Sequence, residues 1–307
     1  MAVVQDRLHP AARAIVEEIA RFRPLSQMTP EEARGAPTPL AAAPEPVASL
    51  IARTIPGPGG AMSVRIYRPM DALPAALVYF HGGGFVIGSL DGADESCRML
   101  ANRGRVVVVS VAYRLAPETK FPGPVEDAYA AVVWVADHAS ELGIDPAKVA
   151  VGGSSAGGNL AAAASLVARD RGGPRVAFQL LTVPVTELSS RAPSHREFAE
   201  GYGLTAADME WFGTHYVTSR ADADNPYASV LRADLRGLPP AFVITAECDP
   251  LRDDGEAYAK RLRDLGIEAS SKRYPGMFHG FLGFPAKLPE AAQAFEDAGV
   301  ALRAALS

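Results

Sequence analysis

The sequence predicts an α/β protein with a mostly parallel central sheet, flanked by helices and covered by a helical cap. Three observations predict this class. Short apolar runs alternate with stretches of helical periodicity from about residue 75 onward. The runs are almost continuously apolar, which is typical of strands buried on both faces. One segment, 187–235, breaks the alternation, so we expect it outside the sheet.

Composition excludes several classes of protein. The 307 residues are 48% hydrophobic and 21% charged, as in an ordinary globular enzyme. A net charge of −5 gives no basic stripe, so we expect no nucleic-acid partner. Cys97 and Cys248 are too few for a disulfide framework and lack zinc-site spacing. We expect no metal and no cofactor. Because no long apolar segment occurs, we also expect no stable membrane association and, by default, a cytoplasmic location.

The first 69 residues contain three kinds of pattern. Apolar residues at helical spacing predict an amphipathic helix over 10–23. The proline- and alanine-rich stretch 24–46 is typical of a linker that crosses the surface. Alternation over 49–55 and 62–69, around the turn sequence PGPGG, predicts a hairpin at a sheet edge. We assign residues 1–45 to the cap.

The rest of the chain supplies the buried strands and their connecting helices. Strands are expected at 75–80, 106–111, 148–153, 176–183, 241–247 and 269–274. Helices are expected at 93–102, 124–139, 156–169, 253–265 and from about 287. The core then comprises residues 46–186 and 236–307, and the segment 187–235 is an inserted part of the cap.

The stretch KVAVGGSSAGGNLAAAASLVAR is expected to form a strand, a sharp turn and a helix. The pattern G-x-S-x-G fits Ser155 but not Ser154, which has Ala156 two positions later. Glycines at both flanking positions let strand and helix approach closely around a strained nucleophile. A glycine-rich turn or a phosphate cradle is the alternative, but neither Gly-Lys-Ser/Thr nor G-x-G-x-x-G occurs here. Ser155 is the candidate nucleophile.

A serine hydroxyl needs a histidine to accept its proton, and the histidine needs a carboxylate to orient it. Of six histidines, only His279 lies in a loop after the final predicted strand. Asp249 directly follows another strand and is our choice of acid, with Glu247 second. Asp253 and Asp254 are first-turn helix residues that the helix dipole explains. The order serine, aspartate, histidine is that of α/β-hydrolases.

The loop HGGGF, directly after a buried strand, is suited to bind a tetrahedral oxyanion. Its glycines let backbone N–H groups approach the developing charge. We expect Gly83 and Gly84 to donate, joined by the Ala156 amide. His81 is interpreted as a scaffold of this loop and not as a proton-transfer group.

Together these motifs resemble the bacterial hormone-sensitive-lipase-like carboxylesterases of the α/β-hydrolase fold. The motifs are HGGGF (81–85), YRLAPE (113–118), FPGPVEDAYAA (121–131), GSSAGGNLA (153–161), DPLRDDG (249–255) and HGF (279–281). The resemblance implies hydrolysis of carboxylic esters without a cofactor, usually with short acyl groups. Two positions depart from the family pattern. Ser154 stands where the family mostly has Asp or Thr, and Ala112 stands where it often has an acidic residue.

Two other functions stay open at this stage. The same triad serves amidases, deacetylases and lactone hydrolases, and substrate choice lies in cap side chains that the sequence does not place. The other function is that of a ligand receptor on the same scaffold. The plant gibberellin receptors resemble this family but lack the catalytic histidine, whereas His279 is present here, which argues against a receptor. The exposed final strand of the sheet could also pair two subunits into a homodimer.

Bulky apolar residues of the two cap segments are expected to roof the substrate pocket and to limit acyl length. In the N-terminal helix they are Ile15, Ile19 and Phe22, and in the insertion they are Met209, Trp211 and Phe212. Phe85 and Phe281 are expected to line the pocket beside them.

Overall fold

The computed structural model describes residues 7–35 and 44–307. Over these residues the chain forms an eight-stranded sheet in the order β1-β2-β4-β3-β5-β6-β7-β8. The strands are β1 (Ser49–Gly57), β2 (Gly60–Arg68), β3 (Ala76–Phe80), β4 (Val107–Val111), β5 (Val149–Ser154), β6 (Phe178–Thr182), β7 (Ala241–Cys248) and β8 (Ala269–Phe278). Only β2 runs antiparallel to its neighbours, and all other pairs are parallel. The predicted α/β class with a mostly parallel central sheet is confirmed.

The helices of the core lie close to the predicted ranges. They are α3 (Asp94–Gly104), α4 (Gly123–Asp137), α5 (Ala139–Leu142), α6 (Ala156–Asp170), α10 (Arg252–Asp264) and α11 (Pro289–Leu306). The largest difference from the sequence prediction is at the last strand, which continues beyond Tyr274 to Phe278. As a result His279 immediately follows β8.

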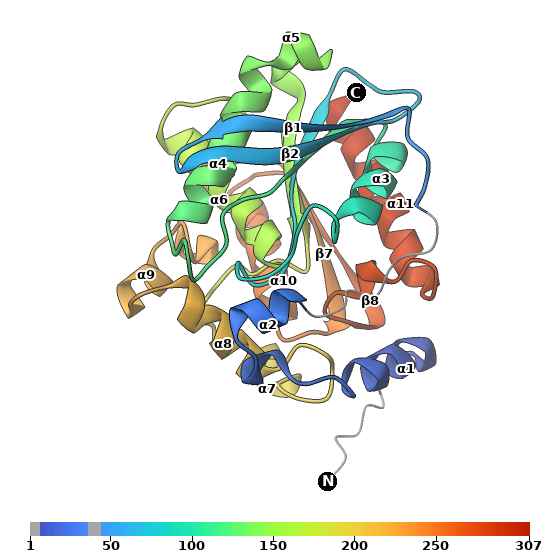
Figure 1. Ribbon diagram of the computed structural model, residues 1–307, viewed down its shortest axis with the longest axis vertical. Helices are drawn as coiled ribbons and strands as arrows, with labels where there is room; N and C mark the ends of the chain where they lie inside the picture. The colour runs from blue at the N-terminus through green and yellow to red at the C-terminus, as the bar shows by residue number, and fades with distance from the viewer. Residues whose placement is uncertain (1–6, 36–43) are drawn as a thin grey trace.

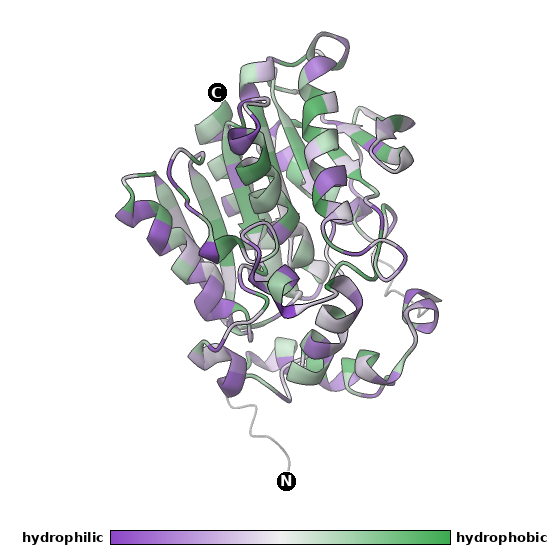
Figure 2. Cartoon of the chain, turned by 90° about the vertical axis from the view of Figure 1, so that its left-hand side faces the viewer, coloured by the Kyte–Doolittle hydropathy of each residue, from purple (hydrophilic) through white to green (hydrophobic). Residues whose placement is uncertain are grey.

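Both faces of the sheet are covered, as the continuous apolar runs require. Successive residues of one strand join different clusters: Val78 and Phe80 pack with α4, α6 and α10, whereas Leu77 and Tyr79 pack with α3 and α11. Figure 2 shows the hydrophobic residues concentrated along the strands and the inner sides of the helices. The side-chain alternation of a strand thus divides the core into two layers.

The cap lies at one end of the sheet, where Figure 1 shows α1, α2, α7 and α8 together. Its N-terminal part contains α1 (Pro10–Ile19), a 3₁₀ turn (Leu25–Gln27) and α2 (Pro30–Gly35), and its inserted part contains α7 (Pro193–Glu197), α8 (Ala206–Tyr216) and α9 (Arg220–Asp224). The Ser26 amide donates to Asp208 Oδ1 at 3.0 Å, and the Trp211 indole donates to the Met28 carbonyl at 3.0 Å. These bonds tie together segments about 180 residues apart.

The linker expected at 24–46 is more ordered than the sequence suggested. Residues 25–27 and 30–35 are helical. The second segment, α2, begins with a capping box, because Thr29 and Glu32 each accept a hydrogen bond from the other's backbone amide. Residues 36–43 of this stretch lie outside the described part of the chain.

Three further properties of the described residues bear on function. None of their helices is both long and apolar enough to cross a membrane. Nowhere in these ranges do three or more His, Cys, Asp or Glu side chains gather in a way that could hold a metal ion. Cys97 and Cys248 are both buried and unpaired.

The tightest backbone contact in the core generates a stability prediction. A Cβ at Gly157 would lie 1.9 Å from the Phe80 carbonyl oxygen. We expect Gly157→Ala to destabilise the fold severely, because two backbones would have to separate. In α8, where nothing lies within 4 Å of an added Cβ, Gly213→Ala should stabilise by up to about 1 kcal/mol through helix propensity. Thermal unfolding of both variants measures the difference, and equal melting temperatures would contradict it.

Candidate active site

Ser155 occupies the sharp turn between β5 and α6. Its backbone has φ 56° and ψ −117°, a conformation that side-chain-bearing residues rarely adopt. The turn is held because the Ser155 amide donates to the Thr182 carbonyl at 2.9 Å, and the Ser155 carbonyl accepts from Val185 and Asn159. Gly153 and Gly157 have no room for a Cβ, which is why this turn needs glycine on both sides. The strain therefore presents the Ser155 hydroxyl at the end of the sheet.

His279 follows β8 and reaches the serine across that end of the sheet. Its Nε2 lies 3.0 Å from Ser155 Oγ, and its Nδ1 lies 2.9 Å from Asp249 Oδ2. With the Nδ1 proton donated to the carboxylate, Nε2 is left free to accept a proton from the serine. The structure thus brings together the three residues predicted from sequence, Ser155, Asp249 and His279.

Asp249 is fully buried after β7 and is itself held in place. Its Oδ1 accepts a hydrogen bond from the Leu251 amide at 2.8 Å, while its Oδ2 faces His279. The second choice of acid, Glu247, accepts from the Gly276 amide at 2.7 Å instead. Asp254 contacts His195 and Ser190, and Asp253 contacts Arg252 and the Ser194 amide. These acidic groups fasten the cap and β8 to the core.

The loop after β3 lies against the nucleophile turn. A Cβ at Gly82 would lie 3.6 Å from Ser155 Cβ. Gly83 and Gly84 both have positive φ, and within the described chain their amides donate to no protein acceptor. Ala156 is the first residue of α6, where amides have no partner in their own helix. Three amides are thus available beside the Ser155 hydroxyl.

His81 is part of the scaffold of this loop. Burial lowers its pKa to about 4, so the imidazole is neutral near pH 7. Its Nδ1 lies 2.7 Å from the Gly82 carbonyl, and its ring stacks on Tyr113, whose hydroxyl donates to the His81 carbonyl. The ring faces the interior of the loop and does not contact Ser155.

Sequence reasoning missed a contact from the N-terminal cap to this loop. The Arg34 guanidinium donates to the Val86 carbonyl at 2.8 Å, to the Ala116 carbonyl at 2.7 Å and to both carboxylate oxygens of Glu118. The bonds connect α2 with the loop and with the YRLAPE stretch. An arginine inside an apparent linker gave no signal of this role.

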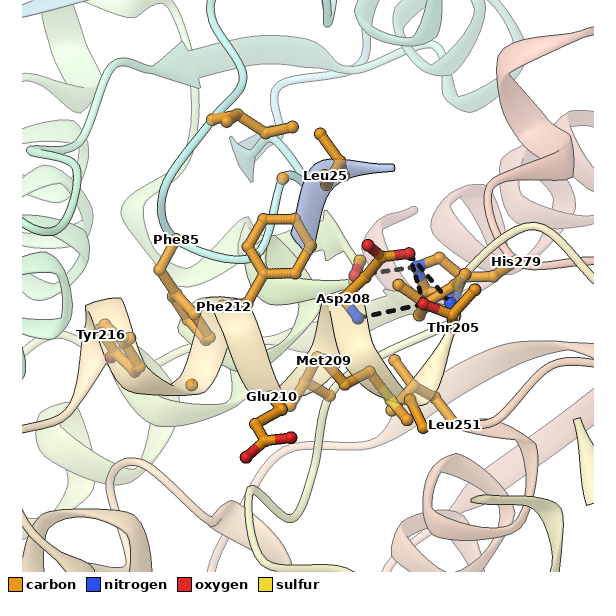
Figure 3. Close-up of a pocket in the computed structure, with 18 of the residues that line it drawn as sticks. Leu25, Phe85, Thr205, Asp208, Met209, Glu210, Phe212, Tyr216, Leu251 and His279 are labelled. Carbon is orange, nitrogen blue, oxygen red and sulfur yellow. Dashed lines mark hydrogen bonds between the residues drawn. The ribbon is translucent and has the colours of Figure 1, made fainter. Parts of the chain in front are cut away.

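A cavity of about 1700 Å³ opens above Ser155 and His279, between the core and the cap. Phe85 and Phe212 line it, as predicted, together with Ile19, Phe22 and Met209 of the roof. Figure 3 shows Met209 and Phe212 on α8 among the lining side chains, with Phe85 and His279. The Phe212 ring contacts Gly84, since a Cβ there would lie 2.1 Å from Phe212 Cδ1.

Three residues predicted to line the pocket do not. Phe281 is fully buried beneath the site and packs on Tyr274, because the 3₁₀ turn after His279 directs it into the core. Trp211 faces the N-terminal cap, where its indole donates to Met28. Ile15 is buried in the core on the inner side of α1, and Val16 lines the pocket instead.

Comparison with known proteins agrees with this geometry. Residues 77–283 match the family described as having the α/β-hydrolase fold. The carboxylesterase NlhH of Mycobacterium tuberculosis is 43% identical over 250 residues, which are 79% of this chain and 78% of NlhH. The chain belongs to the hormone-sensitive-lipase-like esterase family of this fold.

Other members of the family show the same likeness. The carboxylic ester hydrolase LipN of M. tuberculosis is 45% identical over 238 residues, 75% of this chain but 63% of LipN. A hyperthermophilic esterase from the archaeon Pyrobaculum calidifontis superposes with a TM-score of 0.91 at 44% identity, covering 97% of this chain and 98% of its own. The predicted enzyme class, a carboxylic ester hydrolase, is confirmed for this family member.

The two adjacent serines give a direct test of the nucleophile. Ser155→Ala should leave only background hydrolysis, whereas Ser154→Ala should retain most activity, because its hydroxyl is not bonded to His279. Esterase assays of both variants, with mass spectrometry after fluorophosphonate labelling, give the readout. An inactive Ser154 variant, or label on any residue other than Ser155, would refute the assignment.

The carboxylates give a second test. Asp249→Asn should lower kcat by orders of magnitude with the fold intact, since the amide no longer favours the required imidazole tautomer; the comparable change in a serine protease costs about 10⁴-fold. Asp253→Asn should have a mild effect, because that carboxylate contacts Arg252 and not His279. Steady-state kinetics and circular dichroism distinguish the outcomes, and equally severe losses would reopen the choice of acid.

Proposed function

We propose that the protein is a serine carboxylesterase that hydrolyses short-chain acyl esters through an acyl-enzyme, with Ser155, His279 and Asp249 as its catalytic triad. The observation that supports this most is the continuous hydrogen-bonded path from the Ser155 hydroxyl through His279 to the buried Asp249. The names of the related esterases point to the same reaction.

In the proposed acylation, Ser155 Oγ attacks the ester carbonyl while His279 Nε2 takes the hydroxyl proton. Asp249 holds the imidazole and stabilises its positive charge. The carbonyl oxygen becomes an oxyanion, which the amides of Gly83, Gly84 and Ala156 would bind. Loss of one such donor typically costs about 2.7–4 kcal/mol of transition-state stabilisation. His279 then donates its proton to the leaving alcohol.

The preference for short acyl groups rests on the wall next to Ser155. Phe85 and Phe212 bound the cavity beside the glycine loop, and the Phe85 ring stacks on the buried Tyr216 with centroids 3.7 Å apart. An acyl chain that extends from the oxyanion position meets these packed rings. The alcohol would occupy the rest of the cavity, which residues of α1 and α8 also line.

The proposal also ranks the alternative functions and includes a location and an oligomeric state. An amide or lactone could use the same triad, and we rank it second because the named relatives are esterases. A non-catalytic receptor is disfavoured, since all three triad groups are in bonding contact. We also propose a cytoplasmic location and a homodimer that pairs through β8, whose residues 270–273 are exposed at the sheet edge.

Acyl length is the property that tests this function. Each methylene that fits should contribute about 0.8 kcal/mol of burial, so kcat/KM should rise over the first few carbons and then fall at the wall. We would measure kcat/KM for p-nitrophenyl esters from acetate to palmitate, beside amides and lactones. Phe212→Ala should move the optimum to longer chains, whereas Phe284→Ala, outside the cavity, should not. An optimum at palmitate with interfacial activation would indicate a lipase.

A further inference from the structure

A second cavity, of about 360 Å³, lies beside the active site and takes no part in the mechanism described so far. Its inner end borders the large cavity, because Gly82, Gly83, Ser154 and Gly280 line both. Ser154 precedes the nucleophile and Gly280 follows His279 in the chain. The second cavity therefore ends next to both partners of the reacting pair.

The outer end of this cavity lies at the protein surface. Four of its lining residues are exposed there: Gly88, Ser89, Gly92 and Gly283. All four have small side chains or none. At Gly92 an added Cβ would have no neighbour closer than 3.7 Å, so the entrance is uncrowded. The cavity thus extends from solvent to the back of the nucleophile turn.

Five of the lining residues carry hydroxyl groups. They are Ser89, which is exposed at the entrance, Ser96, Tyr79, Thr182 and Ser154. An ordered water needs two to four polar partners and a share of about 30 Å³, so the volume and the hydroxyls suit a short file of waters. Most of the remaining lining is apolar, with Leu100 and Phe295 among it, and its one charged side chain, Arg34, is already paired with Glu118.

We propose that this cavity is the route by which the hydrolytic water reaches the acyl-enzyme, an inference that rests on the proposed function. An acyl group on Ser155 and the departing alcohol both occupy the large cavity, whose lining around the serine is mainly apolar. Water that enters between Ser89 and Gly92 would arrive by way of Ser154 and Gly280, beside His279, without passing the bound acyl chain.

In the proposed deacylation, His279 activates this water for attack on the acyl-enzyme. The water oxygen forms a bond to the acyl carbon while His279 Nε2 takes one of its protons. The tetrahedral intermediate collapses, the bond from the acyl carbon to Ser155 Oγ breaks, and Oγ takes the proton from His279. The carboxylic acid leaves through the large cavity. The second cavity affects only this half of the reaction.

The experiment fills the second cavity without changing the triad or the glycine loop. Gly92→Leu narrows the entrance, and Ser96→Leu fills space inside the cavity. Glu95→Leu is the matched control, because this neighbouring residue of α3 does not line the cavity. With p-nitrophenyl acetate, kcat/KM reports acylation, and benzyl alcohol competes with water for the acyl-enzyme from the large cavity.

We expect both filled variants to keep the wild-type kcat/KM, to lose kcat severalfold, and to raise the ratio of benzyl acetate to acetate severalfold, with Glu95→Leu unchanged. An unchanged product ratio in both filled variants would overturn the proposal. A shift of the acyl-length optimum with an unchanged ratio of benzyl acetate to acetate would also overturn it, because the cavity would then be a binding site for the acyl chain. If wild type gave neither a burst of p-nitrophenol nor any benzyl acetate, the acyl-enzyme itself, and with it the proposed function, would fail.

Discussion

The close approach of β5, α6 and the end of β3 is the constraint on which the site depends. Ser155 can hold its strained turn only because Gly157 lies against the Phe80 carbonyl, where no side chain fits. The same contact places the loop that follows Phe80 beside the serine, and there the Gly83 and Gly84 amides have no acceptor among the described residues. One backbone crossing therefore positions both the nucleophile and the groups that would stabilise the oxyanion.

The other two residues of the proposed triad reach this point from neighbouring parallel strands. Asp249 follows β7 and His279 follows β8, and carboxyl ends of parallel strands meet at one edge of a sheet. A buried carboxylate is costly unless it is bonded. Here Leu251 and His279 supply those bonds, so the carboxylate is both satisfied and aimed.

The core strands and the meeting of Ser155, Asp249 and His279 could be predicted, because local sequence marks the strands and the loops that follow them. Apolar runs mark the strands, and glycine spacing selects Ser155 over Ser154. Side-chain direction in the cap could not be predicted, because it depends on contacts between distant segments. Trp211 turns toward Met28, and Phe281 enters the core after a turn that periodicity does not reveal. Arg34 was missed for the same reason, since its partners lie more than 50 residues away.

The two-part cap has a consequence for how this enzyme can diversify. Residues of α1, of the 3₁₀ turn at Leu25–Gln27 and of α8 line the pocket, and two hydrogen bonds, Ser26 to Asp208 and Trp211 to Met28, join the turn segment to α8. Met209 and Phe22, which line the pocket, both lie outside the strands of the sheet. Substitutions at such positions can accumulate over generations and alter the preferred ester while leaving the β5–α6 crossing intact. Selectivity and chemistry are thereby open to selection separately.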